Sequence, residues 1–92
     1  MPASQTVDFD PSRHARLSDQ VSLRDEEFGA LAYHHGTRRL VFIKSPKLLA
    51  LLRHLDDFDT VGDALAASVE LDERASYSAA LGALWRSGLL GE

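Results

Sequence analysis

The chain contains no cysteine among its 92 residues. This absence excludes disulfide bonds, thiolate metal sites and a cysteine nucleophile, and it is compatible with a reducing compartment. No apolar run approaches the roughly 20 residues of a membrane-spanning helix, and the N-terminal stretch MPASQTVDFDPSRHARLSDQ lacks the apolar segment of a signal peptide. We therefore expect a cytoplasmic protein with no membrane partner.

Acidic residues are missing from the middle of the chain. No Asp or Glu lies between Glu27 and Asp56, although the formal net charge is −4. The cations in this window are Arg38, Arg39, Lys44, Lys47 and Arg53. An acidic protein is a poor nonspecific binder of nucleic acid, so this basic strip is either part of an ordinary mixed surface or a site for an acidic ligand.

Residues 1 to 18 are polar and show no sustained period, and we predict a flexible N-terminal arm there and a single domain over residues 19 to 92. Three short strands follow. QVSLR alternates apolar and polar residues, FGALAYH forms the second strand, and HGT makes a tight turn at Gly36 into the third, within TRRLVFIK.

The third strand has four consecutive apolar residues. Successive side chains of a strand point to opposite faces, so Leu40 and Phe42 share one face while Val41 and Ile43 share the other. Either the fold buries both faces or a partner covers one of them.

Three helices are predicted after the strands. Ser45 before Pro46 is a typical helix start, Thr60 is predicted to cap the second helix, and Asp72 is predicted to cap the third, which ends at Gly88. This order predicts an α+β domain, a winged helix-turn-helix in which a three-stranded antiparallel sheet is followed by three helices.

The side chains offer no complete catalytic or metal-binding set. Adjacent His34 and His35 point to opposite faces of a strand, and no neighbouring carboxylate completes a ligand set with them. No nucleophile stands beside a base and an orienting partner in any recognisable motif. We predict that the protein is not an enzyme and binds no metal or cofactor.

A helix-turn-helix raises DNA binding as an alternative function. The predicted recognition helix begins with DERASYS, in which Asp72 and Glu73 would repel phosphates that only Arg74 and the distant Arg86 attract. We therefore expect no nucleic-acid partner and keep DNA binding as the second hypothesis. A third hypothesis is an interaction domain that docks to an enzyme without holding a peptide.

An edge strand is suited to binding a peptide as an additional strand. The third strand would supply apolar surface, its flanking cations would hold carboxylates, and the third helix would wall the groove. The predicted peptide-binding residues are Arg38, Arg39, Leu40, Val41, Phe42, Ile43, Lys44, Tyr77, Ala80, Leu81 and Leu84. The four helix residues are equally consistent with a core role. Without peptide, the open edge is compatible with a monomer or a weak dimer.

The stretches FGALAYHHGTRRLVFIKSP, LLRHL, FDTVGDAL and YSAALGALWRSGLL resemble the precursor-peptide chaperones of mycofactocin biosynthesis and, more distantly, the pyrroloquinoline quinone biosynthesis protein D. The resemblance covers about residues 20 to 90. It implies that the leader of a ribosomally made precursor lies antiparallel to the third strand, in a groove completed by the third helix. It also implies a radical S-adenosylmethionine enzyme as a second partner, which carries iron–sulfur clusters and modifies the Val-Tyr end of the precursor. The chain itself has no cysteine with which to ligate a cluster.

Overall fold

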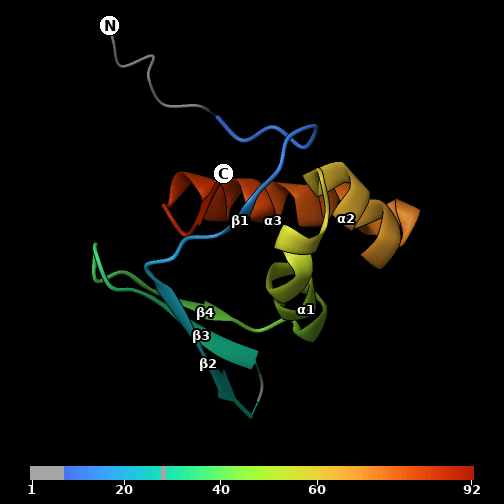
Figure 1. Ribbon diagram of the computed structural model, residues 1–92. Helices are drawn as coiled ribbons and strands as arrows, with labels where there is room; N and C mark the ends of the chain where they lie inside the picture. The colour runs from blue at the N-terminus through green and yellow to red at the C-terminus, as the bar shows by residue number, and fades with distance from the viewer. Residues whose placement is uncertain (1–7, 28) are drawn as a thin grey trace, which may run out of the picture.

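A three-stranded antiparallel sheet stands beside three helices. The computed structural model describes residues 8–27 and 29–92. Its main sheet has the order β2-β3-β4 and is formed by β2 (Val21–Glu26), β3 (Gly29–His34) and β4 (Leu40–Ile43). Figure 1 shows this sheet at the lower left, α1 beside it, and α2 and α3 above. The predicted α+β class and the order of strands before helices are confirmed, whereas the winged helix-turn-helix name stays a prediction.

The helical part contains three α-helices and two short 3-10 helices. In chain order they are α1 (Pro46–His54), η2 (Leu55–Asp57), α2 (Val61–Ser68), η3 (Leu71–Glu73) and α3 (Arg74–Arg86). Two predicted caps are confirmed. The Ser45 hydroxyl accepts from the Leu48 amide at 3.1 Å, and the Thr60 hydroxyl accepts from the Asp63 amide at 3.0 Å, because free amides at a helix start need such acceptors.

The predicted start of the third helix is wrong. Asp72 lies inside η3, and Glu73, which occupies the cap position of α3, makes no capping side-chain bond. The Glu73 amide donates instead to the Glu70 carbonyl at 2.9 Å, so the tight turn itself supplies the acceptors that a capping side chain would have offered. The other end is as predicted, since Gly88 has a φ of +89° beyond the last turn of α3.

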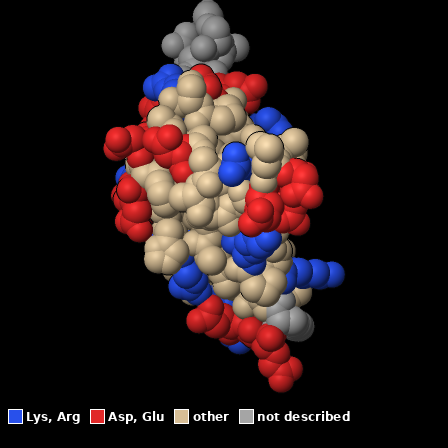
Figure 2. Space-filling model, turned by 90° about the vertical axis from the view of Figure 1, so that its right-hand side faces the viewer, with Lys and Arg blue, Asp and Glu red and all other residues tan. Residues whose placement is uncertain are grey.

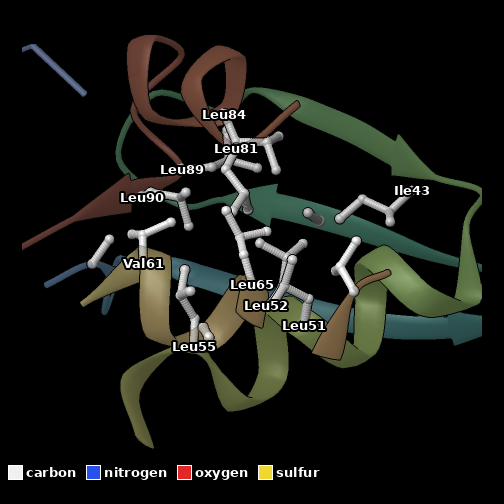
Figure 3. Packing of buried hydrophobic residues seen from close by; sticks show 14 residues of the cluster. Ile43, Leu51, Leu52, Leu55, Val61, Leu65, Leu81, Leu84, Leu89 and Leu90 are labelled. Atoms are coloured by element: carbon white, nitrogen blue, oxygen red, sulfur yellow. The ribbon is translucent and has the colours of Figure 1, made fainter. Parts of the chain in front are cut away.

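One apolar core joins the helices to the inner face of the sheet. Figure 3 shows leucines of α1, α2 and α3 converging on one another, with Ile43 of β4 reaching in from the sheet. Leu89 and Leu90 also enter this core, at 0% and 5% exposure. Helix α1 faces this core with one side, because Leu51 and Leu52 are its buried residues.

The segment before the main sheet is part of the packed body. Two residues, β1 (Arg16–Leu17), pair antiparallel with β5 (Leu90–Gly91) at the end of the chain. The carbonyls of Pro11 and Arg13 accept from the Gly62 and Val61 amides at 2.8 and 2.9 Å, at the start of α2. Ala15 is 2% exposed.

This arrangement differs from the arm predicted for residues 1 to 18. Residues 8 to 18 lie against the helices, because backbone carbonyls of the segment satisfy amides of α2 and its apolar side chains have burial to gain. Residues 1 to 7 of the predicted arm lie outside the described residues, and a domain boundary after residue 18 stays a prediction.

Candidate functional site

The site begins with the backbone of β4, which is an outer strand of the main sheet. At its start the His34 amide donates to the Arg39 carbonyl at 2.9 Å, while the Arg38 amide donates to the His34 carbonyl at 2.7 Å. Two residues of one strand thus oppose one residue of the other, which is a β-bulge. Because the Arg39 carbonyl points to β3, alternation turns the backbone amides and carbonyls of Leu40 and Phe42 toward the outer edge.

The two faces of β4 are buried to different extents. Ile43 is 3% exposed and Val41 packs against the core, whereas Leu40 is 58% and Phe42 38% exposed. The predicted division of these four side chains between two faces is confirmed. The fold buries one face and leaves much of the other at the surface, which is unusual for large apolar side chains side by side.

The exposed face continues from β4 onto β3. Tyr33 lies directly opposite Leu40, and Leu31 lies opposite Phe42. Residues opposite each other in an antiparallel pair share a face, and both β3 side chains are half-buried. These four residues, Leu31, Tyr33, Leu40 and Phe42, are called the outer apolar strip below.

The cations that flank β4 differ from the other cations of the chain. Six ion pairs join Arg13 to Glu92, Arg16 to Asp19, Arg24 to Glu26, Lys47 to Glu73, Arg53 to Asp25 and Arg86 to Asp8. Arg74 donates to the carbonyls of Val69 and Ala66. Within residues 8–27 and 29–92, Arg38, Arg39 and Lys44 make no ion pair and are exposed. The uncompensated positive charge of the described chain therefore lies at the two ends of β4.

Lys44 also borders a hollow near the turn between β2 and β3. The hollow measures about 510 Å³, and its lining residues are Asp25, Glu26, Glu27, Gly29, Lys44, Pro46 and Leu49. Two of its three carboxylates are neutralised by arginines, since Asp25 binds Arg53 and Glu26 binds Arg24. Figure 2, which views the molecule from the right-hand side of Figure 1, shows Asp and Glu on both sides and at the bottom, with Lys and Arg scattered over the face and several of them just above the acidic group at the bottom.

The predicted helix residues divide into two kinds. Leu81 and Leu84 are 0% and 9% exposed and point into the core, as Figure 3 shows, so their side chains contribute to packing. Tyr77 and Ala80 are half-buried and retain surface. Of the four predicted helix residues, these two are the ones whose side chains remain partly exposed.

Tyr77 is held close to the end of β4. Its hydroxyl lies 3.4 Å from the hydroxyl of Ser45, two residues after Ile43. The Lys47 ammonium lies 5.9 Å from the centre of the Tyr77 ring and donates to Glu73 at 2.9 Å. The Glu73 carboxylate, which accepts this hydrogen bond, raises the pKa of Lys47. One end of the predicted groove is therefore formed by an ordered contact between α1 and α3.

His34 is a residue of the site that the sequence interpretation missed. Its side chain is 9% exposed, and its Nδ1 accepts from the amides of Gly36 and Thr37 at 3.1 and 3.0 Å. The imidazole therefore holds the turn that precedes Arg38 and sets where β4 begins. The alternation of GALAYH contained the signal, because it places His34 on the same buried face as Ala30 and Ala32.

The remaining histidines lie apart from one another. His14 Nε2 is 2.6 Å from Asp56, His54 Nδ1 is 3.3 Å from Asp57, and His35 Nε2 is 2.7 Å from the Ser22 hydroxyl. In the described part of the chain, no three His, Asp or Glu side chains gather in a way that would hold a metal ion. None of the helices described there combines the length and the apolar character needed to cross a membrane.

Comparison with known proteins assigns the chain to a class of small chaperones that act on peptides. It belongs to the Peptide chaperone MftB family, whose model matches residues 14–91. Over 83 residues it is 48% identical to the peptide chaperone MftB of Mycobacterium ulcerans (strain Agy99). The aligned region covers 89% of this chain and 76% of that protein. It is 42% identical over 88 residues to the protein of the same name from Mycolicibacterium smegmatis, covering 95% of this chain and 86% of that protein.

The match to Mycobacterium tuberculosis MftB is also 42% over 88 residues, covering 95% of this chain and 81% of that protein. The family name describes a chaperone, which is a role without catalysis, so the prediction that the chain is not an enzyme is confirmed. No solved structure matches the chain.

Proposed function

We propose that the chain binds the leader of a ribosomally synthesised precursor peptide as an added strand at β4 and presents it to a radical S-adenosylmethionine enzyme in mycofactocin biosynthesis. The observation that carries this proposal is the outer position of β4 together with the three cations at its ends. An open edge gives affinity through main-chain hydrogen bonds, and neighbouring side chains give specificity. Membership of a peptide chaperone family supports the same function.

The charges favour an acidic leader. Arg38, Arg39 and Lys44 make no ion pair in the described chain, so a carboxylate that approaches them breaks no existing pair. Such exposed charges act mainly on the association rate and on the choice of partner. On the inner side of the edge, Tyr77 and Ala80 of α3 would contact the alternate side chains of the leader.

The DNA-binding alternative finds little support at the start of α3. Arg74 is the cation nearest that helix start, and its guanidinium donates to the carbonyls of Val69 and Ala66 at 2.9 and 3.3 Å. A phosphate would have to compete with both carbonyls and to approach Asp72 and Glu73. The enzyme partner rests on the resemblance of the sequence, because the relatives' names describe only the handling of a peptide.

The experiment that tests the proposal is an amide-resolved NMR titration of the whole chain with the leader of a precursor peptide. Strand addition is expected to shift the amides of residues 38 to 44 most strongly, with a second group at Tyr77 and Ala80. New protection from hydrogen exchange at Leu40 would identify the outer edge as the site, since its amide points there. A spectrum that stays unchanged at high peptide excess would leave docking to the enzyme as the better account.

A pair of substitutions in β4 separates binding from folding. Phe42→Asp is expected to leave the fold intact, because the side chain is 38% exposed, and to weaken leader binding about tenfold or more, because a charge replaces apolar contact area. Ile43→Asp is the matched control. That side chain is 3% exposed, so a buried carboxylate there should unfold the protein. Unaltered leader affinity in folded Phe42→Asp would place the peptide elsewhere.

A further inference from the structure

The edge of β4 has a defined hydrogen-bonding register, which restricts what binds there. The Arg39 carbonyl is bonded to β3, so Leu40 and Phe42 are the residues of β4 whose backbone groups point outward. In an antiparallel added strand, the residues opposite these two would be the hydrogen-bonded pairs. Their side chains would share the face of Leu40 and Phe42 and extend the outer apolar strip.

The cations fix the positions of charge relative to that register. Lys44 lies two residues beyond Phe42, while Arg38 and Arg39 lie two and one residues before Leu40. Lys44 is thus five positions from Arg39 and six from Arg38. The bulge at Arg38 brings two cations to one end of the strand. If one carboxylate of a peptide lies opposite Lys44, a second carboxylate five or six positions further along the peptide therefore meets positive charge at that end.

We infer that the β4 edge selects peptides with a carboxylate, then two apolar residues at alternate positions, then a second carboxylate five or six positions after the first. In chain direction, the first carboxylate lies opposite Lys44, the apolar residues lie opposite Phe42 and Leu40, and the second carboxylate lies opposite Arg38 and Arg39. This inference rests on the proposed strand addition and names the class of leader that the site binds.

The same register disfavours pairing between two copies of the chain. Antiparallel self-pairing that joins Leu40 of one copy to Phe42 of the other places Lys44 opposite Arg38 at both ends. Like charges directly opposite each other destabilise a strand pair, and charged residues are a common means of protecting sheet edges. An acidic peptide replaces both repulsive contacts by attractive ones, so the cations discriminate between the two partners.

The test uses a synthetic peptide, acetylated and amidated, with the sequence Thr-Glu-Thr-Leu-Thr-Leu-Thr-Glu-Thr. A scrambled peptide of the same composition is the control, and binding is followed by the amide shifts of residues 38 to 44 at low salt. The patterned peptide is expected to bind more tightly than the scrambled one. Replacing either Glu by Lys should weaken binding about three- to fivefold, the range expected for one exposed cross-strand charge pair.

A charge exchange fixes the direction of the peptide. With Lys44→Glu, binding is expected to be restored by Lys at the first Glu position of the peptide and not by Lys at the second. The opposite result would mean a parallel strand and would overturn the proposed register. The amide spectrum of the variant verifies its fold, and the titration is run at protein concentrations at which sedimentation shows the variant to be monomeric.

The two possible failures are distinct. If the scrambled peptide binds as tightly as the patterned one at the same amides, the edge accepts peptides but the charge pattern is wrong. If neither these peptides nor the leader shifts residues 38 to 44, the strand addition itself is wrong and the inference falls with it.

Discussion

Arg38 occupies a backbone conformation that side chains rarely adopt. Its φ is +61°, in the left-handed region where a β-carbon costs about 1–2 kcal/mol, and glycine is the usual residue at this position of such a bulge. The sequence places its glycine two positions earlier, at Gly36, whose amide donates to the imidazole of His34. An arginine, whose cation lies beside the proposed binding edge, thus occupies a backbone position at which glycine would be unstrained.

Glycine at position 38 should therefore stabilise the fold and weaken binding. Arg38→Gly is expected to raise the free energy of unfolding by about 0.5–1 kcal/mol, the gain from relieving a left-handed side chain less the added entropy of the unfolded chain. The same variant should bind an acidic peptide less tightly, because one cation is lost. Urea denaturation gives the first quantity and an NMR titration the second.

Arg39→Gly is the matched control for this prediction. Among the described non-glycine residues, positive φ is confined to Arg38, so glycine at position 39 should lower the free energy of unfolding by about 0.5–1 kcal/mol, as in other extended segments. A stabilised Arg39→Gly, or a destabilised Arg38→Gly, would contradict the strain argument.

For single residues, the sequence predicts which side chains share a face of a strand better than it predicts which face is buried. The alternation in LVFI correctly separates Leu40 and Phe42 from Val41 and Ile43. It contains no information on which pair is buried, because all four are apolar and the answer depends on where α1 and α3 pack. For the same reason Leu81 and Leu84 were equally acceptable as groove or core residues, and their burial is decided by tertiary contacts.

Elements with a clear period were predictable, and elements without one were not. The helix starts at Ser45 and Thr60 have local chemical signals and are confirmed. The pairing of β1 with β5 joins Leu17 to Leu90, two short segments far apart in the sequence, and a two-residue strand shows no alternation to detect. For that reason the sequence alone predicts one arm over residues 1 to 18.

Phe9 anchors this segment on α3. Its ring centroid is 6.2 Å from that of Trp85, and one of its ring carbons lies near Gly82, which has no side chain to obstruct it. Phe9→Ala is expected to lower the free energy of unfolding by about 1–2 kcal/mol, less than for a fully buried aromatic residue because Phe9 is half-buried. Trp85 is the sole tryptophan, so its emission should shift as solvent gains access to it.

Phe9→Leu tests whether the effect comes from apolar contact. It should retain most of the stability and most of the Trp85 emission, because a large apolar side chain remains. Equal losses in the two variants would indicate that the aromatic pairing matters more than burial. No change in Phe9→Ala would mean that the backbone bonds to α2 hold the segment without the ring.

Across the whole molecule, charge is segregated more strongly than the net value suggests. The chain has an excess of acids, yet in the described residues the three cations that have neither an ion pair nor a carbonyl partner for their side chain all flank one strand. The sequence showed the acid-free window that contains them. The sequence could not show that these cations lack ion-pair partners. That follows from the structure, in which Asp25, Glu26 and Glu73 pair with other cations.

Reversing the charge at one end of β4 should promote self-association. In Lys44→Glu, both Lys44–Arg38 contacts of a self-paired edge become Glu–Arg contacts, which are favourable when directly opposite. Sedimentation at low salt is expected to show a dimer at concentrations where the unaltered chain is monomeric, and added salt should reverse it.

Arg24→Glu supplies the control for this comparison. It makes the same change of charge on β2, at the opposite side of the sheet from β4. If this variant associates as strongly as Lys44→Glu, net charge and not the β4 edge governs association. If Lys44→Glu sediments like the unaltered chain, like-charge repulsion is not what keeps the edges apart.

The pairing of Arg16 with Gly91 brings two distant parts of the chain side by side. A linker that joins the end of the chain to residue 8, and so keeps the packed residues 8 to 15, would allow the chain to be opened elsewhere, since circular permutation requires only that the two ends be bridged. Opening it in the turn at residues 35 to 37 would make β4 the first strand and free its start for a fused leader. Such a permutant would present its own peptide at millimolar effective concentration, which would convert a weak encounter between two molecules into a permanent intramolecular one.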